Sequence, residues 1–66
     1  MRVTVNGRDR SFETSVSVDG LVSSLIAARK GVAVAVNGTV VPRSQWTSTA
    51  LADGDSVEVL TAAQGG

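Results

Sequence analysis

The sequence contains no cysteine and no histidine, and its only aromatic residues are Phe12 and Trp46. These absences exclude a disulfide, a thiol nucleophile, an imidazole base and an ordinary zinc site. Serine and threonine are frequent, but nothing in the sequence indicates a group that would activate a hydroxyl. We therefore expect the chain not to be an enzyme, and we interpret its Asp and Glu residues as solvated surface charges.

An excess of charge of one sign is also absent, because six Lys and Arg residues balance six Asp and Glu residues. A basic block would be typical of a protein that binds nucleic acid or an anionic membrane, and none is present. The apolar runs are far shorter than the roughly 20 residues of a membrane span. The N-terminus has the pattern of a strand and not of a signal peptide. These features predict no nucleic-acid or membrane partner and a cytoplasmic location.

The 66 residues are enough for one small domain, and hydrophobic residues make up 42% of them, as in ordinary globular proteins. Valine is frequent, which favours a sheet. The first strand, Arg2–Val5, ends at an Asn-Gly pair, a strong hairpin signal, and a return strand follows to Glu13. A two-residue turn pairs Val3 with Arg10, which places arginines on the core face. We favour a longer loop that pairs Val3 with Phe12.

A helix is predicted to begin after Ser17, which is a good N-cap, with Asp19 in the first turn where its charge suits the helix dipole. Arg29 and Lys30 occupy its last turn, and Gly31 is predicted at the C′ position. The apolar positions follow the spacing of one helical stripe. They are Val18, Leu21, Val22, Leu25 and Ile26.

Three further strands follow, and one amphipathic helix must cover one face of the sheet. The fold class is therefore α+β: a β-grasp (ubiquitin-like) plan with a mixed sheet of four to five strands. Residues 1–60 form the domain, and residues 61–66 form a flexible C-terminal tail. The segment from Arg43 to Leu51 is expected to be irregular and anchored by Trp46. The predicted strands are Val32–Val36, Thr39–Val41 (ended by Pro42) and Ser56–Leu60, with turns at Asn37-Gly38 and Asp53-Gly54.

The tail ends in Gly65-Gly66, which leaves a narrow segment that could enter a channel in another protein. A frayed terminus is the alternative interpretation. The carboxylate of Gly66 is ionised at neutral pH and is a poor electrophile. Adenylation by ATP would create a leaving group, and a sulfur nucleophile could then form a thiocarboxylate. The activating enzyme would supply the MgATP site, so the domain itself is expected to bind no cofactor and no metal.

Two segments closely resemble the ThiS family of thiamine-biosynthesis sulfur carriers: VAVAVNGTVVPRSQW, Val32 to Trp46, and LADGDSVEVLTAAQGG, Leu51 to Gly66. The resemblance covers the whole chain in length and order. It implies that an E1-like adenylyltransferase (ThiF) activates the terminal glycine and that a sulfur donor protein supplies sulfur. Thiazole synthase (ThiG) then takes the sulfur for the thiazole of thiamine. Gly66 would carry the sulfur, beside Gly65, with Gln64 and Ala63 as channel contacts.

A partner surface is also predicted. Leu60, Ala33 and Ala35 are expected on the sheet face that the helix leaves open, where a small apolar area would suit docking. Arg43 is a further candidate contact, whereas Trp46 is interpreted as a core anchor.

Three other functions remain open. The chain could carry sulfur for molybdopterin or cysteine synthesis, or it could be a ubiquitin-like modifier joined to lysines. It could also be an interaction domain whose tail does no chemistry.

Overall fold

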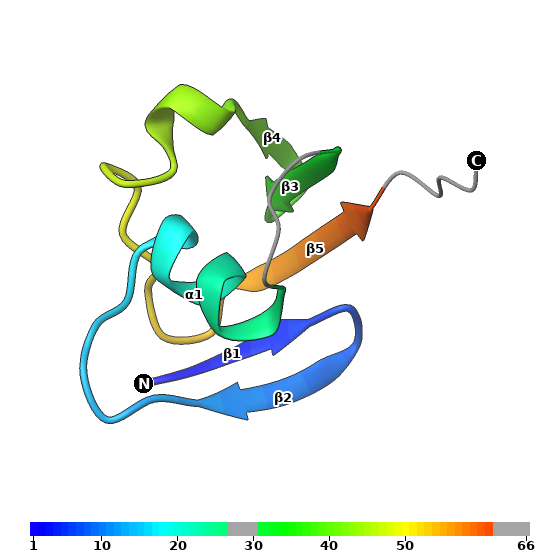
Figure 1. Ribbon diagram of the computed structural model, residues 1–66. Helices are drawn as coiled ribbons and strands as arrows, with labels where there is room; N and C mark the ends of the chain where they lie inside the picture. Colours follow the sequence, from blue (N-terminus) through cyan, green and yellow to red (C-terminus); the bar gives the residue numbers. More distant parts are fainter. Residues whose placement is uncertain (27–30, 62–66) are drawn as a thin grey trace.

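The computed structural model describes residues 1–26 and 31–61, which form a mixed five-stranded sheet with one helix across one face (Figure 1). The α+β prediction and the β-grasp plan are confirmed. No helix in this part of the chain is long and apolar enough to cross a membrane. In chain order the elements are β1 (Arg2–Val5), β2 (Arg8–Ser11), α1 (Val18–Leu25), β3 (Val32–Val36), β4 (Thr39–Val41), the 3-10 helix η1 (Arg43–Gln45) and β5 (Ser56–Thr61).

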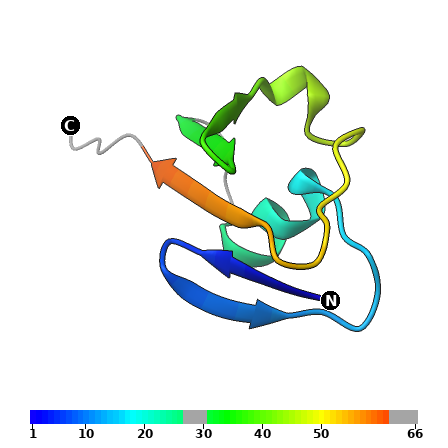
Figure 2. The same ribbon diagram turned by 180° about the vertical axis from the view of Figure 1, so that it is seen from behind.

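The last strand, β5, lies in the middle of the sheet, whose order is β2-β1-β5-β3-β4. It runs parallel to β1 and antiparallel to β3, so it is hydrogen-bonded on both sides. Each of its neighbours belongs to a hairpin with an Asn-Gly turn, and both turns have positive φ at Asn and Gly, as a type I′ turn requires. Figure 2 shows the sheet from behind, with α1 on the far side.

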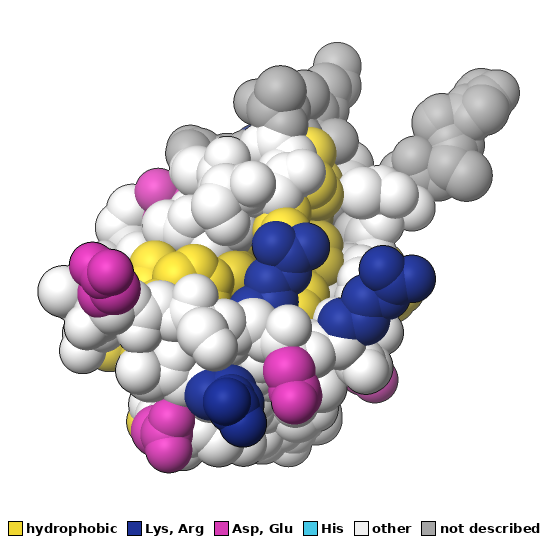
Figure 3. Space-filling model, turned by 90° about the horizontal axis from the view of Figure 1, so that it is seen from below, with side chains coloured by type: hydrophobic (Ala, Val, Ile, Leu, Met, Phe, Trp, Pro, Cys, Tyr) yellow, Lys and Arg dark blue, Asp and Glu magenta, His cyan; other side chains and the backbone are white. Residues whose placement is uncertain are grey.

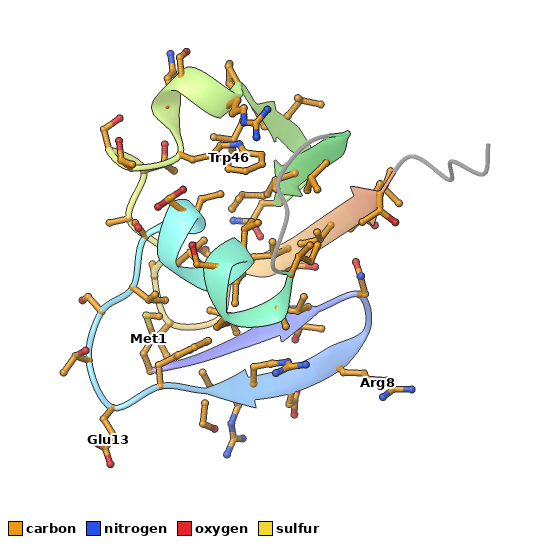
Figure 4. All side chains as sticks on the ribbon, viewed as in Figure 1. Met1, Arg8, Glu13 and Trp46 are labelled. Atoms are coloured by element: carbon orange, nitrogen blue, oxygen red, sulfur yellow. The ribbon has the colours of Figure 1, made fainter. Side chains whose placement is uncertain are left out.

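The core lies between α1 and the sheet, and Trp46 closes one end of it. Trp46 is only 2% exposed, which confirms it as the anchor of its segment. Its ring lies between α1 and the β3–β4 hairpin (Figure 4). The indole Nε1 donates a hydrogen bond to the Val41 carbonyl at 2.9 Å, and the Trp46 carbonyl accepts one from the Asp19 amide at 3.1 Å. The segment is less irregular than predicted, because it begins with η1.

The predicted register of the first hairpin is wrong. The turn has two residues, so Val3 pairs with Arg10 and Val5 with Arg8. Arginines are tolerated on this side because β2 is an edge strand whose four residues are all exposed. Phe12 still packs against the core, because its backbone exchanges hydrogen bonds with Met1 at 2.8 and 2.9 Å.

The helix begins as predicted but is shorter. The Ser17 Oγ accepts a hydrogen bond from the Gly20 amide at 3.0 Å, and the helix ends at Leu25. Ile26 has an extended backbone yet still packs against the core, so the apolar periodicity overstates the helix length. Gly31 is therefore not the C′ residue, and it instead takes a positive φ of 75° just before β3. Arg29 and Lys30 lie outside the described residues.

The Trp46 anchor can be tested by replacing Trp46 with Phe and with Ala. We expect Trp46→Phe to lower the free energy of unfolding by about 1–2 kcal/mol, because the Val41 carbonyl loses its donor. Trp46→Ala should cost about 3–5 kcal/mol through the cavity it creates. Urea unfolding followed by circular dichroism measures both changes, since the only tryptophan fluorophore is removed. The exposed neighbour Thr47 provides the control: Thr47→Ala should change stability by less than about 0.5 kcal/mol. An equal loss in all three variants would contradict the anchor role.

Candidate functional site

The candidate site is the C-terminal tail, and the structure describes the strand from which it leaves. β5 continues to Thr61, one residue beyond the predicted strand end at Leu60. The predicted tail residues Gly66, Gly65, Gln64 and Ala63 lie outside the described residues, and their functional roles remain predictions. What the structure establishes is the base of the tail: it follows the central strand, which is held by pairing along both edges.

Asn6 fixes β5 near this base through its side chain. Its Oδ1 accepts a hydrogen bond from the Val59 amide at 2.8 Å, and its Nδ2 donates one to the Val59 carbonyl at 3.1 Å. The side chain thus replaces a strand partner where the ladder between β1 and β5 ends at Val57. The turn position puts Asn6 in the left-handed region (φ 51°), where Asn is tolerated.

Asn37 fixes the other end of β5. Its side-chain Oδ1 accepts a hydrogen bond from the Ser56 backbone amide at 2.9 Å, and its backbone amide donates one to the Ser56 carbonyl at 2.7 Å. Asp55 is a surface carboxylate that accepts hydrogen bonds from the Asn37 Nδ2 at 3.0 Å and from the Ala52 amide at 2.8 Å, so it also supports the Asn37-Gly38 turn. Both Asn-Gly turns therefore shape a hairpin and also hold the strand that leads into the tail. Sequence reasoning identified the turns but missed the second role.

A small apolar patch lies on the open face of the sheet. The register sets Ala33 beside Leu60 and Ala35 beside Val40, so the four side chains share the face opposite α1. Leu60 is 67% exposed and Val40 69% exposed, far more than any core residue. We call Ala33, Ala35, Val40 and Leu60 the open-face patch. Val40 was missed, although the alternation through the Asn37-Gly38 turn pairs it with Ala35 and could have revealed it.

Arg43 was predicted as a further partner contact, and that role remains a prediction. Its guanidinium lies over the Trp46 ring, with the Cζ atom 5.7 Å from the ring centroid. This is a cation–π distance, and it gives Arg43 a structural contact of its own. Within residues 1–26 and 31–61, no three acidic side chains gather where they could hold a metal ion.

Comparisons with known proteins agree with this architecture. Residues 3–66 match the model of the ThiS family. The chain belongs to the ThiS family. The crystal structure of thiamine biosynthesis protein ThiS from Geobacter metallireducens superposes with a TM-score of 0.84 at 38% identity, covering all of both chains. A solution structure of a thiamine biosynthesis protein from the same organism gives 0.82 at 38% identity, covering 100% of this chain and 88% of the other.

Two sequence relatives extend the ThiS comparison. The sulfur carrier protein ThiS of Escherichia coli (strain K12) is 29% identical over 66 residues, which are the whole of both chains. A thiazole synthase of Paramagnetospirillum magneticum (strain ATCC 700264 / AMB-1) is 35% identical over the same 66 residues. The chain spans only 20% of the length of that synthase. The resemblance to ThiS carriers stated from the sequence is thus confirmed.

The role of Asn6 can be tested with Asn6→Gly, which keeps the positive φ but removes both contacts to Val59. We expect the free energy of unfolding to fall by about 1–2 kcal/mol. Hydrogen exchange at the Val59 amide should accelerate, since its acceptor is lost. Asn37→Gly is the matched control, because it should accelerate exchange at Ser56 instead. If Asn6→Gly left the Val59 exchange rate at the wild-type value, the hydrogen bonds from Asn6 would not be what holds β5 at Val59.

Proposed function

We propose that the chain is a sulfur carrier whose C-terminal carboxylate, on Gly66, is converted to a thiocarboxylate for thiazole formation in thiamine biosynthesis. The observation that carries this proposal is a Gly-Gly terminus that follows the central strand of a ThiS fold, where Asn6 binds the backbone of that strand. A sequence without Cys or His offers no other group on which to carry sulfur. In this proposal the chain is a protein co-substrate and not a catalyst.

The proposed chemistry takes place on the terminal carboxylate. A carboxylate oxygen attacks the α-phosphorus of ATP, and pyrophosphate leaves, so the terminus becomes an acyl adenylate. A sulfur nucleophile at the oxidation level of sulfide then attacks the carbonyl carbon. AMP departs with one carboxylate oxygen, a proton is released, and the thiocarboxylate remains. MgATP belongs to the activating enzyme.

Three kinds of partner follow from this chemistry. An E1-like, ThiF-like adenylyltransferase would form the adenylate, and a sulfur donor protein would supply the nucleophile. A ThiG-like thiazole synthase would accept the sulfur. Support for the last comes from the relative named thiazole synthase, part of which aligns with this whole chain. A cytoplasmic location remains a prediction from the sequence.

The open-face patch is the surface we propose for docking onto these enzymes. Exposed apolar side chains on a small domain are typical of interaction sites when they are contiguous. The patch includes Leu60, which immediately precedes the last described residue, Thr61. A protein that holds the tail would therefore lie close to the patch. Ala33 and Ala35 keep the surface shallow, so a partner can approach the backbone of β3.

The carrier proposal is tested by the intact mass of the chain after incubation with the E1-like enzyme, MgATP and a sulfide source. We expect a gain equal to replacing one oxygen by one sulfur, and no gain in a variant that lacks Gly66. An unchanged mass, with an enzyme shown to be active on another carrier, would refute the proposal and favour an interaction domain. Recovery of the chain joined to lysines of other proteins would favour a modifier.

The docking patch is tested by Leu60→Asp. We expect the KM of the E1-like enzyme for the chain to rise by about tenfold, corresponding to about 1.4 kcal/mol, because apolar contact is lost and a charge is buried. Stability should change little, since Leu60 is largely exposed. Ser44→Asp, which adds the same charge at an exposed position of η1, should leave KM unchanged. Equal KM values for both variants would argue against docking through the patch.

A further inference from the structure

A groove of about 320 Å³ lies on the opposite side of the sheet from the open-face patch. It opens between the turn end of the β1–β2 hairpin and the C-terminal end of α1. Its walls combine apolar and cationic side chains. They include Val5 and Val59 from the sheet, Leu25 and Ile26 from the end of the helix, and Arg8 and Arg10 from β2.

The charge of the groove follows from the two-residue turn. Because strand residues alternate, Arg8 and Arg10 lie on the helix side of β2, whereas Asp9 lies on the other side and accepts a hydrogen bond from Thr4. No ion pair joins Arg8 or Arg10 to a carboxylate in residues 1–26 and 31–61, and both side chains are exposed. Figure 3 shows dark-blue side chains beside a hydrophobic strip on this side of the molecule. The chain has no net charge, so the two arginines at the groove are a local feature and not part of an overall positive charge.

The wall formed by β2 has a second feature. β2 is an edge strand, and among residues 1–26 and 31–61 it pairs with β1 alone, so its outer backbone groups are not used in the ladder. Figure 4 shows Arg8 at the hairpin end of this strand, extending away from the ribbon. Edge strands of this kind accept an extended segment of another protein, whose alternate side chains enter neighbouring pockets. A matching segment needs apolar side chains for the groove and carboxylates for the two arginines.

Thr61 also lines the groove, so the groove adjoins the base of the tail. The five residues from 62 to 66 can span at most about 17 Å. An enzyme that holds the carboxylate of Gly66 is therefore within reach of the groove. We propose that the groove docks an extended segment of the tail-activating enzyme in which acidic residues stand beside apolar ones. The identity of that partner rests on the proposed function.

The test measures the Kd between the chain and the E1-like adenylyltransferase by calorimetry, without ATP. We expect Arg8→Glu and Arg10→Glu each to raise Kd by about fivefold or more, because a like charge then faces the acidic segment. Arg2→Glu is the matched control: it makes the same charge change on an exposed residue of β1 that faces the open side of the sheet. Its Kd should stay within about twofold of wild type.

Several outcomes decide the proposal. Equal Kd values for all three variants, or no binding of the wild-type chain, would overturn it. Arg8→Gln and Arg10→Gln remove charge without reversing it, and a smaller rise in Kd is expected for each; circular dichroism verifies that every variant is folded. The carrier proposal is tested separately, by the intact mass of the chain and of the variant that lacks Gly66. Binding that depends on Arg8 and Arg10 with no sulfur gain would support the groove and refute the carrier, and the reverse result would refute only the groove.

Discussion

The structure depends on the hydrogen bonding of β5 in the centre of the sheet. This last strand pairs with β1 on one edge and β3 on the other, so it is the strand that joins the two hairpins into one sheet. Asn6 and Asn37 extend this pairing by binding the backbone of β5 near its two ends. The consequence for function is geometric. The residues before the tail belong to a strand that is paired along both edges in the middle of the sheet, so the position from which the tail leaves is well defined.

Alternation along the strands divides the molecule into two chemically different sides. On the helix side, valines of β1, β3 and β5 pack with α1, whereas Arg8 and Arg10 of the edge strand β2 are not covered by the helix and stay exposed. On the open side, alanines leave a shallow surface on which Leu60 and Val40 stand exposed. Both sides meet at the end of β5. A partner that takes the tail therefore encounters an apolar patch on one side and a cationic groove on the other.

In the proposed function, a domain of this size takes part in demanding chemistry without catalytic side chains of its own, because its reactive group would be the terminal carboxylate. The domain then needs only to present that group and to be recognised. Few residues are needed to hold this fold. Trp46 packs at one end of the core, and the Asn6 side chain takes the place of a strand partner where the ladder ends. Membership of the ThiS family agrees with the role of a small sulfur carrier.

The sequence alone determined the fold class, the order of the elements, the helix N-cap at Ser17, the second hairpin and the identity of the terminal residues, because these features depend on local chemistry and on simple periodicity. It also marked Trp46 as an anchor. It did not determine the register of the first hairpin or the end of the helix. Both depend on contacts distant in sequence: an edge position lets β2 tolerate Arg8 and Arg10, and Ile26 packs on the core from an extended backbone. Only the tertiary structure could bring Asn6 to Val59 and set Arg8 and Arg10 beside Thr61 at the base of the tail, since both arrangements require β5 to lie next to β1 in the sheet.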